Sequence, residues 1–323
     1  MPLPRAPVVV EASAPSSIAN LGCLFDLAAM AVNHARDLVR VRVRRGEGLT
    51  VKSLDPSVPG GERNTAHGAA LAVLRKAGLS ASDVRVEIEV AKGVEPGVGL
   101  GSSGATAAAA AYALNEALGS PLSTAELVEA AGEGEAVAAG TPHYDNVAAS
   151  LLGGVAVVVS RSPLRVVRLE PPEGLLVVLA VPRGAVEVPG ERKTEFFRGV
   201  LPSHVTLSEA VEQCSAAAEF LVGLMLGDLE ALGRAVSRGG VVEASRGRLI
   251  RGYWEVKRRA LESGALGVNI AGAGPSVFAL AREGEARAVA EAVREAFAEA
   301  GVEAEVRVLR PEPVGARVER KVQ

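Results

Sequence analysis

Apolar and charged residues alternate along two stretches in the N-terminal half of the chain, Asp37–Arg45 and Val84–Val90. An alternation with a period of two is typical of a strand that buries one face in an antiparallel sheet. In 64–77 and in the alanine-rich stretch 102–117, the apolar positions recur with helical spacing instead. The short apolar run Gly153–Ser160 predicts a buried strand. The N-terminal half is therefore expected to alternate strands and helices.

A third helix in this half has clear start and stop signals. Ser123 and Glu126 have the spacing of a capping box, in which each side chain bonds the backbone N–H of the other residue. Leucines flank this start at the positions of a hydrophobic staple. We predict a helix from Ser123 to about Ala139, ended by Gly140.

The second half of the chain begins near the passage 171–174, Pro-Pro-Glu-Gly, which separates two apolar strands and marks a change of domain. We place the change between Ser160 and Pro172 and divide the chain into domains 1–165 and 166–323. Strands with helices on one face favour α+β layers in both halves. The elements predicted in the second half are strand 175–181, helices 203–226 and 245–263, strands 267–270 and 277–281, helix 284–300 and strand 302–309.

Composition and charge exclude several classes of protein. The 323 residues are 48% apolar and 23% charged, which excludes a disordered chain and fits two compact domains. No apolar run approaches the ~20 residues that span a bilayer, and the N-terminus shows no signal peptide. The formal charge of −3 gives no general attraction to nucleic acid or anionic membrane. Two cysteines and four scattered histidines make neither a disulfide framework nor a zinc motif. We therefore expect a cytoplasmic protein without nucleic-acid or membrane partners.

Aromatic residues make up only 3% of the chain. The core must therefore be built from Val, Ala and Leu. Recognition by stacking on several aromatic side chains, as in proteins that bind single-stranded nucleic acid, is excluded.

The strongest chemical signal is the segment 95–104, Glu-Pro-Gly-Val-Gly-Leu-Gly-Ser-Ser-Gly, which leads directly into the alanine-rich helix. Its glycines permit positive φ angles and a close approach of the backbone to a ligand. The helix start offers free N–H groups and the positive end of the dipole, so the segment suits phosphate binding. It is neither a Walker A loop nor a dinucleotide fingerprint, because the residues of those motifs are missing. A plain glycine turn with a serine N-cap remains the structural alternative.

Two further segments are weaker signals when each is taken alone. The loop 270–276, Ile-Ala-Gly-Ala-Gly-Pro-Ser, lies between two predicted strands, where a glycine-rich hairpin would look the same. The segment 14–26 follows the opening strand and is unusually polar, with Asn20 and Asp26 six residues apart. An Asx-turn loop is the structural alternative for this segment.

In this order, the three segments resemble the GHMP kinase family, named for galacto-, homoserine, mevalonate and phosphomevalonate kinases. The family combines a polar N-terminal motif, a central P-x-x-x-G-L-G-S-S loop and a C-terminal G-x-G-P loop. Residues 96–103 depart from this pattern only in the spacing of Pro96. The resemblance implies a two-domain α+β GHMP kinase fold, with an N-terminal ATP-binding domain similar to domain 2 of ribosomal protein S5 and a ferredoxin-like C-terminal half.

Within this family, the chain is most similar to the kinases that phosphorylate homoserine. Residues 20–26 resemble their N-x-x-x-G-F-D motif, with Cys23 and Leu24 in place of the usual small residues. Residues 143–148, His-Tyr-Asp-Asn-Val-Ala, resemble the segment H-x-D-N-V-A, which discriminates best because the sugar and mevalonate kinases have different residues here.

Two arginine-containing segments extend the same resemblance. Residues 198–202 are similar to an R-x-x-L-P segment. Residues 243–249 are similar to an E-P-x-R stretch, with Ala where Pro is usual. Arg246 is the matching arginine there, and Arg248 is a competing candidate.

The resemblance implies that ATP and L-homoserine are the substrates and that O-phosphohomoserine is made on the route to threonine. Homoserine is a small zwitterion with a primary hydroxyl group. Arg198 and Arg246 suit its carboxylate, because a guanidinium forks onto a carboxylate with two hydrogen bonds. An arginine chosen at random is more often an exposed surface residue. Only the family resemblance singles out Arg198 and Arg246 from the other arginines of the chain. The candidates for the ammonium and the hydroxyl are Asn20, Asp26, His143, Asp145 and Asn146.

Phosphoryl transfer needs neutralisation of charge more than covalent chemistry. We expect Mg²⁺ at Ser102 and Glu135, since this ion prefers oxygen ligands and keeps several waters. The predicted catalytic residues are Asp145, Asn146 and Glu135. Asp145 stands near the place of an aspartate base in mevalonate-type relatives, but we favour catalysis by positioning and electrostatic stabilisation without a base.

The nucleotide site is expected at the two glycine loops. Lys92 either contacts phosphate or is an exposed lysine at a strand end. Asn64 matches a position that contacts the base in the family. The predicted ATP-binding residues are Asn64, Lys92, Pro96, Gly97, Gly99, Leu100, Gly101, Ser102, Ser103, Gly104, Gly272 and Gly274.

Two other functions remain open at this point. One is another small-molecule kinase of the same fold, acting on shikimate or mevalonate. The other is a non-catalytic ligand sensor on this fold, which the intact serines and carboxylates disfavour. The resemblance also implies a homodimer, because homoserine kinases are generally dimers.

Overall fold

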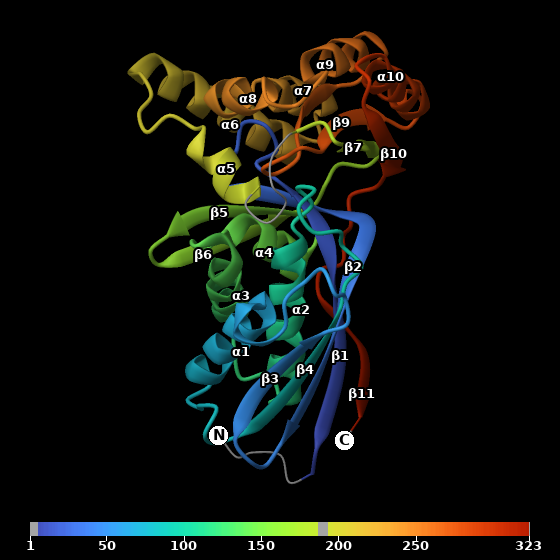
Figure 1. The fold of residues 1–323 in the computed structure, drawn as a ribbon. Helices are drawn as coiled ribbons and strands as arrows, with labels where there is room; N and C mark the ends of the chain where they lie inside the picture. Colours follow the sequence, from blue (N-terminus) through green and yellow to red (C-terminus); the bar gives the residue numbers. More distant parts are fainter. Residues whose placement is uncertain (1–5, 187–192, 323) are drawn as a thin grey trace.

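The alternating stretches of the N-terminal half pair with each other in one sheet of seven strands (Figure 1). The computed structural model describes residues 6–186 and 193–322. Strand β2 (Ala28–Arg44) lies between β1 (Val8–Ala19) and β4 (Arg85–Ala91), antiparallel to both. The valines in the second half of β2 are buried, and the arginines between them are exposed. The remaining strands of this sheet are β3 (Gly48–Ser53), β5 (Val155–Arg161), β6 (Leu164–Leu169) and β11 (Arg317–Val322).

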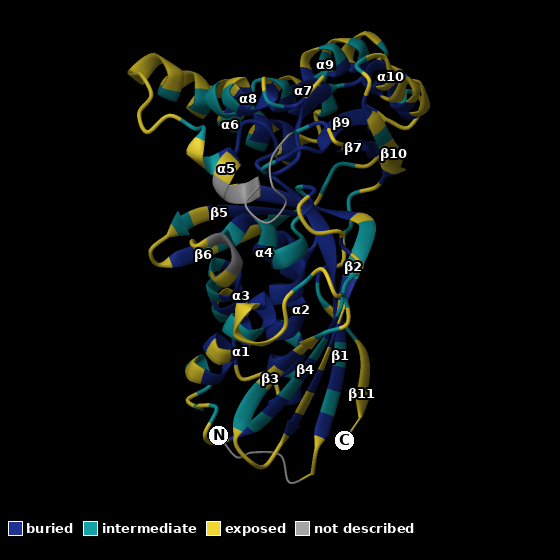
Figure 2. Cartoon of the chain, viewed as in Figure 1, coloured by how far each residue is buried: buried dark blue, intermediate teal, exposed yellow. Residues whose placement is uncertain are grey.

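Helix α2 (Ser102–Ala117) is the centre of this half. It packs against β1 and β2 and also contacts α1 (Thr65–Lys76), α3 (Thr124–Ala139) and α4 (Tyr144–Leu152). Its small alanine side chains are all buried and let these five neighbours approach closely. The core that results is made of strand valines and helix alanines, as the scarcity of aromatic residues predicts (Figure 2).

The second sheet is antiparallel, in the order β10 (Glu303–Leu309), β7 (Leu175–Arg183), β9 (Val277–Arg282) and β8 (Gly267–Ile270). Odd-numbered residues of β7 from 175 to 181 pack against α6 and α7, and the even-numbered residues 176–180 pack against α9 and α10. Helices therefore lie on both faces of this sheet, where the sequence predicted one face. The helices of this half are α5 (Lys193–Gly199), α6 (Leu207–Leu226), α7 (Leu229–Ser237), α8 (Gly240–Gly247), α9 (Tyr253–Glu262) and α10 (Ala286–Glu299).

Several predicted boundaries are confirmed or corrected by the geometry at helix ends. The capping box of Ser123 and Glu126 forms, and α3 ends at Gly140 in the left-handed conformation. Helix α6 begins at Leu207 rather than at 203, because Thr206 caps it with a capping box of its own. The helix predicted over 245–263 is two helices, α8 and α9, since Gly252 takes a positive φ of 81° at the start of α9.

The C-terminal strand was not predicted. β11 returns to the first sheet and pairs antiparallel with β1, so the last residues of the chain join the N-terminal half. The predicted division at residue 165 falls inside β6, which also belongs to the first sheet. The α+β fold itself is confirmed, but the two sheets do not divide the chain at one point.

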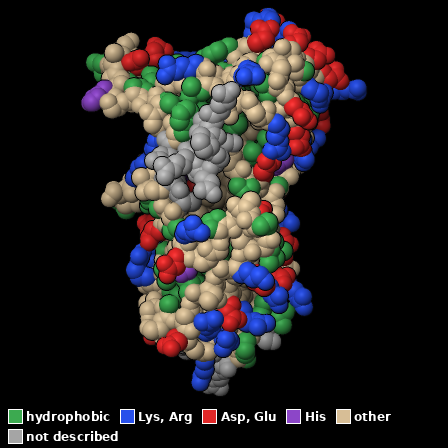
Figure 3. Space-filling view, in the orientation of Figure 1, with side chains coloured by type: hydrophobic (Ala, Val, Ile, Leu, Met, Phe, Trp, Pro, Cys, Tyr) green, Lys and Arg blue, Asp and Glu red, His purple; other side chains and the backbone are tan. Residues whose placement is uncertain are grey.

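The surface view in Figure 3 shows basic and acidic side chains intermixed over the visible face. Most of the arginines whose contacts are described form ion pairs with glutamates, for example Arg258 with Glu262 and Arg234 with Glu219. Among the described residues, no helix combines the length and apolar character needed to cross a membrane.

Candidate active site

A cavity of about 830 Å³ gathers residues from stretches that are far apart in the sequence. Its wall includes parts of 19–26, 56–65, 92–106 and 135–146, together with residues of α5, α8 and the loop 272–274. All the predicted site residues line it except Gly104. Gly104 is buried in α2, where a Cβ would come within 3.1 Å of Asn146 Cβ. Its role is close packing of α2 against α4.

The phosphate loop 95–101 can pack tightly because glycine occupies two crowded positions, Gly99 and Gly101, where a side chain would collide with neighbouring atoms. Gly101 takes the left-handed conformation and caps the N-terminus of α2. A Cβ at Gly101 would lie 2.7 Å from Asn146 Oδ1, and a Cβ at Gly99 would collide with the carbonyl oxygen of Ala271. The loop therefore touches both the start of α4 and the C-terminal glycine loop, and the first residues of α2 line the cavity.

Asn20 links the N-terminal motif to the C-terminal glycine loop. Its Nδ2 donates to the Gly272 carbonyl oxygen at 2.8 Å, and its Oδ1 accepts from the Asp26 backbone N–H at 3.0 Å. Asn20 and Asp26 both have positive φ, at 71° and 57°. The side chain of Asn20 thus holds the tight turn that presents Asp26 to the cavity.

Opposite charges face each other at one end of the cavity. Arg198 Nη2 lies 3.0 Å from both carboxylate oxygens of Asp26 and 2.8 Å from His143 Nε2. Because an arginine only donates, His143 Nε2 accepts here and its ring proton is on Nδ1, which lies 3.8 Å from Glu135 Oε1. Burial on its own lowers the pKa of His143, but the nearby negative charges of Glu135 and Asp145 outweigh burial, so the net pKa is raised.

Arg246 is the second arginine at this end, and the competing candidate Arg248 is excluded by position. Arg246 is 3% exposed and donates to the carbonyl oxygens of Phe197 and Gly272, both at 3.1 Å. Burial lowers its pKa to about 10, while the charge of Asp26 acts in the opposite direction. Arg248 is exposed at the end of α8 and does not line the cavity.

The ring of Phe25 lies close to both guanidinium groups. Arg198 Cζ lies 5.7 Å and Arg246 Cζ 5.4 Å from the centre of its ring. Both contacts are within the range of a cation–π interaction. The ring therefore helps to hold two like charges at one end of the cavity.

The first turn of α4 presents the acidic and amide groups that the sequence predicted. Asp145 is 2% exposed, and its Oδ1 accepts from the Asn146 backbone N–H at 2.8 Å. Burial raises the pKa of Asp145 to about 6, with a further contribution from the charges of Asp26 and Glu135. Asn146 Oδ1 accepts from Ser17 Oγ at 2.9 Å, which orients the amide.

The serine that is hydrogen-bonded to Glu135 is Ser103, and the predicted Ser102 has another partner. Ser103 Oγ donates to Glu135 Oε1 at 2.9 Å, whereas Ser102 Oγ donates to the Val94 carbonyl oxygen at 2.7 Å. Glu135 Oε2 is buried and has no hydrogen-bond partner among the described residues. An unpaired buried carboxylate oxygen next to a hydroxyl fits a hard cation such as Mg²⁺.

Two predicted nucleotide residues have structural contacts of their own. Lys92 is not an exposed lysine, because its side chain is 4% exposed and pairs with the fully buried Asp37. Asn64 is the N-cap of α1: its Oδ1 accepts from Ala66 N at 3.0 Å and its Nδ2 donates to the Pro59 carbonyl oxygen at 2.7 Å. Both residues still line the cavity.

Several cavity residues lie outside the predicted motifs. The loop Pro56–Pro59 and the exposed Arg63 form part of the wall near Asn64, and Phe25 and Thr106 form other parts. No motif marks the 56–63 stretch, which becomes part of the site only because β3 and α1 bring it to the phosphate loop.

Comparison with known proteins agrees with this geometry. The model of the GHMP kinase N-terminal domain matches residues 64–154, and that of the C-terminal domain matches 217–299. The chain is 41% identical to the homoserine kinase of Pyrobaculum aerophilum over 91% of this chain and 96% of that protein. This chain belongs to the homoserine kinases of the GHMP kinase family.

A second relative and two solved structures extend the comparison. The homoserine kinase of Aeropyrum pernix is 41% identical over 85% of this chain and 88% of that protein. The crystal structure of homoserine kinase from Cytophaga hutchinsonii superposes with a TM-score of 0.86 and 35% identity, covering 96% of this chain and 97% of that one. A mevalonate kinase from L. major has the same fold, with a TM-score of 0.65, but only 16% identity.

Proposed function

We propose that the protein transfers the γ-phosphoryl group of ATP to the hydroxyl of L-homoserine, giving O-phospho-L-homoserine for threonine biosynthesis. One observation carries the proposal. The Asp26–Arg198 pair and the N-terminus of α2 line the same cavity, so a zwitterion and a triphosphate can bind side by side. The homoserine kinases among the relatives support the choice of acceptor.

The acceptor is held by charge at both of its ends. The ammonium of homoserine binds Asp26, and its carboxylate binds Arg198 and Arg246. Arg198 bonds both carboxylate oxygens of Asp26 in the structure. A zwitterion that enters between them replaces one ion pair with two, which recognises both charged groups at once. An acceptor that lacks one of the two charges still separates Asp26 from Arg198 but leaves one of them without a partner, which costs binding free energy.

The hydroxyl of homoserine lies at the first turn of α4. Asn146 and Asp145 orient it toward the nucleotide, and His143 links this turn to Arg198. The site supplies positioning and charge, and the proton of the hydroxyl does not need a dedicated base. Asn20 acts through Asp26, because both of its polar atoms are bonded to backbone.

The triphosphate binds the loop 95–101 and the first N–H groups of α2, where the helix dipole favours an anion. Glu135 and Ser103 are the residues of this chain that would hold Mg²⁺. The ion supplies neutralisation of charge on the β- and γ-phosphates when it is bound. Among the described residues, no cluster of three or more acidic, His or Cys side chains forms a metal site.

The test is an assay of ADP release with Mg·ATP and a panel of acceptors, L-homoserine, shikimate and mevalonate. We expect kcat/KM for L-homoserine to exceed that for the other two by about 10³-fold or more, because they lack the ammonium that Asp26 needs. Turnover of mevalonate or shikimate without turnover of homoserine would assign the chain to another activity of this fold. Absence of acceptor-dependent ADP release with the whole panel would favour a non-catalytic sensor.

We also propose that the protein is a cytoplasmic homodimer. The exposed apolar side chains on α6 support self-association, because contiguous apolar surface often marks an interaction site. They include Leu207, Val211, Val222 and Met225. Light scattering of the purified protein is expected to give twice the mass of the 33.1 kDa chain, and a monomer would contradict this proposal.

A further inference from the structure

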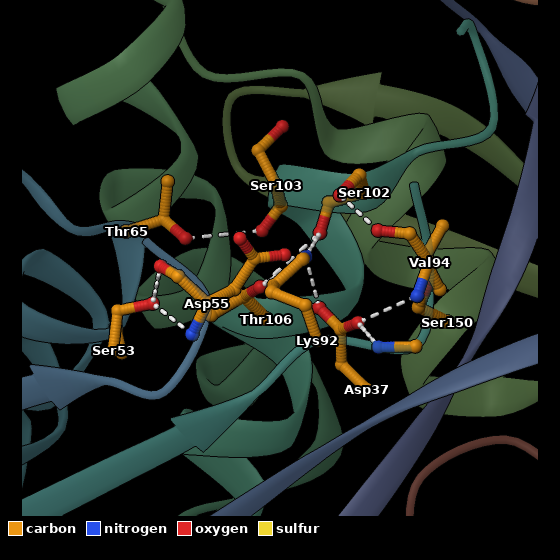
Figure 4. A network of polar contacts seen from close by, with 12 residues as sticks. Asp37, Ser53, Asp55, Thr65, Lys92, Val94, Ser102, Ser103, Thr106 and Ser150 are labelled. Atoms are coloured by element: carbon orange, nitrogen blue, oxygen red, sulfur yellow. Dashed lines mark hydrogen bonds and ion pairs between the residues drawn. The ribbon is translucent and has the colours of Figure 1, made fainter. Parts of the chain in front are cut away.

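A buried network of polar side chains lies behind the phosphate loop (Figure 4). Its central residue is Asp37 of β2, which is completely buried. Asp37 Oδ1 accepts from the backbone N–H groups of Gly93 and Val94, both at 2.9 Å. Asp37 Oδ2 accepts from the Lys92 ammonium and from Thr106 Oγ1, the latter at 2.5 Å. Both oxygens of this carboxylate are therefore fully used.

The ammonium group of Lys92 is used completely as well. Its Nζ donates to Asp37 and also to Ser102 O at 2.9 Å and Thr106 Oγ1 at 2.8 Å. An ammonium has three hydrogens, so all three have protein partners. Lys92 thus behaves as part of the scaffold, although it lines the cavity.

The network joins the two ends of the phosphate loop. Gly93 and Val94 precede the loop, and Ser102 and Thr106 belong to the first turns of α2 that follow it. Ser102 Oγ adds a direct bond to the Val94 carbonyl oxygen at 2.7 Å. Every other connection between the two ends in this network passes through Asp37 or Lys92.

The buried ammonium of Lys92 needs the negative charge of Asp37 beside it. A cation beside the first turn of a helix is opposed by the positive end of the helix dipole. Burial disfavours the charged ammonium further and lowers the pKa of Lys92, and the charge of Asp37 acts in the opposite direction. Removing one partner of such a buried pair leaves an uncompensated charge.

We propose that Asp37 is a positioning residue for nucleotide binding, which fixes the spacing between the two ends of the phosphate loop by holding Lys92 and Thr106. It acts through these residues and does not touch the nucleotide. The inference rests on the proposed nucleotide site at this loop. It assigns a function to the one acidic residue on the buried face of β2 next to the site.

The test is calorimetric binding of Mg·ATP in the absence of any acceptor. In Asp37→Asn, the amide still accepts from Gly93 and Val94, but its NH₂ faces the donors Lys92 and Thr106. We expect the Kd for Mg·ATP to rise at least tenfold, with the KM for homoserine changed less than threefold. Glu129→Gln is the matched control, because it breaks the Lys76–Glu129 ion pair in the same half without touching the loop. This control is expected to leave the Kd unchanged.

A second pair of variants and a double variant separate positioning from general stability. Thr106→Val should weaken Mg·ATP binding and Thr106→Ser should restore it. Asp37→Asn combined with Lys92→Met should recover the melting temperature, because no buried charge is left unpaired, without recovering the affinity. An unchanged Kd in Asp37→Asn, or an affinity that recovers together with the melting temperature, would overturn the inference. The calorimetric titration contains no acceptor. Failure of homoserine turnover would therefore overturn the proposed function and leave the result on Mg·ATP binding unaffected.

Discussion

The two ends of the cavity use paired charges in different ways. At the acceptor end, Arg198 and Asp26 bond each other across the cavity wall, and the Asp26 side chain is 20% exposed. Behind the phosphate loop, Asp37 and Lys92 are buried and every hydrogen-bonding position of the ammonium is taken. The acceptor-end pair can exchange partners with a ligand, whereas the pair behind the loop cannot do so without breaking the scaffold.

This difference separates recognition from preorganisation. A charge that binds a ligand must be able to give up its partner, and a zwitterion offers a replacement for each member of the Asp26–Arg198 pair. A charge that shapes a loop is more useful when its partners are fixed, because a rigid phosphate loop loses less freedom on binding. Substitutions at the acceptor end should therefore change the kinetics for homoserine, and substitutions behind the loop should change the affinity for nucleotide.

The largest effect at the acceptor end is expected at Arg246. In Arg246→Met, the carboxylate of homoserine loses a buried cation, which costs about 2–5 kcal/mol. We expect kcat/KM for homoserine to fall by about 30- to 5,000-fold, while the Kd for Mg·ATP stays within a factor of three. Initial-rate kinetics with each substrate varied in turn give both values.

Arg248→Met is the matched control for this prediction. Arg248 lies two residues further along the chain, is exposed and does not line the cavity. The kinetics of the Arg248→Met variant should therefore equal those of the unmodified protein. Equal losses in the two variants would show that the position of Arg246 has no special role.

Glu135 lies between the two ends, next to both Ser103 and His143. Glu135→Gln removes the charge of the unpaired oxygen that fits Mg²⁺. We expect the concentration of Mg²⁺ for half-maximal activity to rise by about 10–100-fold, as is typical when a residue of a metal site is changed. A titration of activity with Mg²⁺ at fixed ATP measures this value.

Glu133→Gln supplies the comparison for Glu135. Glu133 is on the same helix but pairs with Arg75 at the surface. Its Mg²⁺ titration should match that of the unmodified protein. A Glu135→Gln variant with an unchanged Mg²⁺ requirement would contradict the assignment of this carboxylate.

A smaller effect is expected at Asp145, where positioning is proposed in place of base catalysis. We expect Asp145→Asn to lower kcat by tens-fold, and a loss beyond ~10⁴ would indicate a general base. The pKa of Asp145 is raised to about 6, so its carboxylate is ionised above pH 6 and protonated below it. The activity should therefore fall as the pH drops through about 6, and the Asn variant should lose this inflection. A pH–rate profile of both proteins measures it.

Stability gives an internal control for the same variant. Folding raises the pKa of the Asp145 carboxyl from 3.8 to about 6, so the folded protein favours its neutral form. Ionisation of this carboxyl therefore destabilises the folded protein. The loss of stability begins near pH 4 and is complete above about pH 6. Asp145→Asn should raise the free energy of unfolding at pH 7 by an amount on the order of 2–3 kcal/mol. Loss of activity together with lower stability would mean that the variant perturbs the fold.

The features that depend on a local sequence motif could be predicted from the sequence. The capping box at Ser123 and Glu126, the alanine-rich helix and the loop 95–101 all form as their residue types require. The arginine in register with the family motif, Arg246, lines the cavity, and Arg248 does not. These features depend on neighbours within a few residues.

Features that depend on distant neighbours were missed or misassigned. Which serine meets Glu135 depends on how α2 rotates against α3, and residue spacing does not give that rotation. The burial of Lys92 depends on Asp37, which is 55 residues away in the sequence. The sequence does contain an indication for Asp37. Residues of β2 are alternately buried and exposed, and Asp37 falls at a buried position, in register with Val39 and Val41. A charged residue in a buried phase indicates a partner, but not which residue that partner is.

We propose that the acceptor end recognises both charges of a zwitterion. The most direct measurement is kcat/KM for L-homoserine beside two analogues that keep the hydroxyl, 4-hydroxybutyrate without the ammonium and 3-aminopropan-1-ol without the carboxylate. We expect each analogue to be at least 10³-fold poorer than homoserine, since each leaves one member of the Asp26–Arg198 pair without its replacement partner. Turnover of either analogue within tenfold of homoserine would contradict the account.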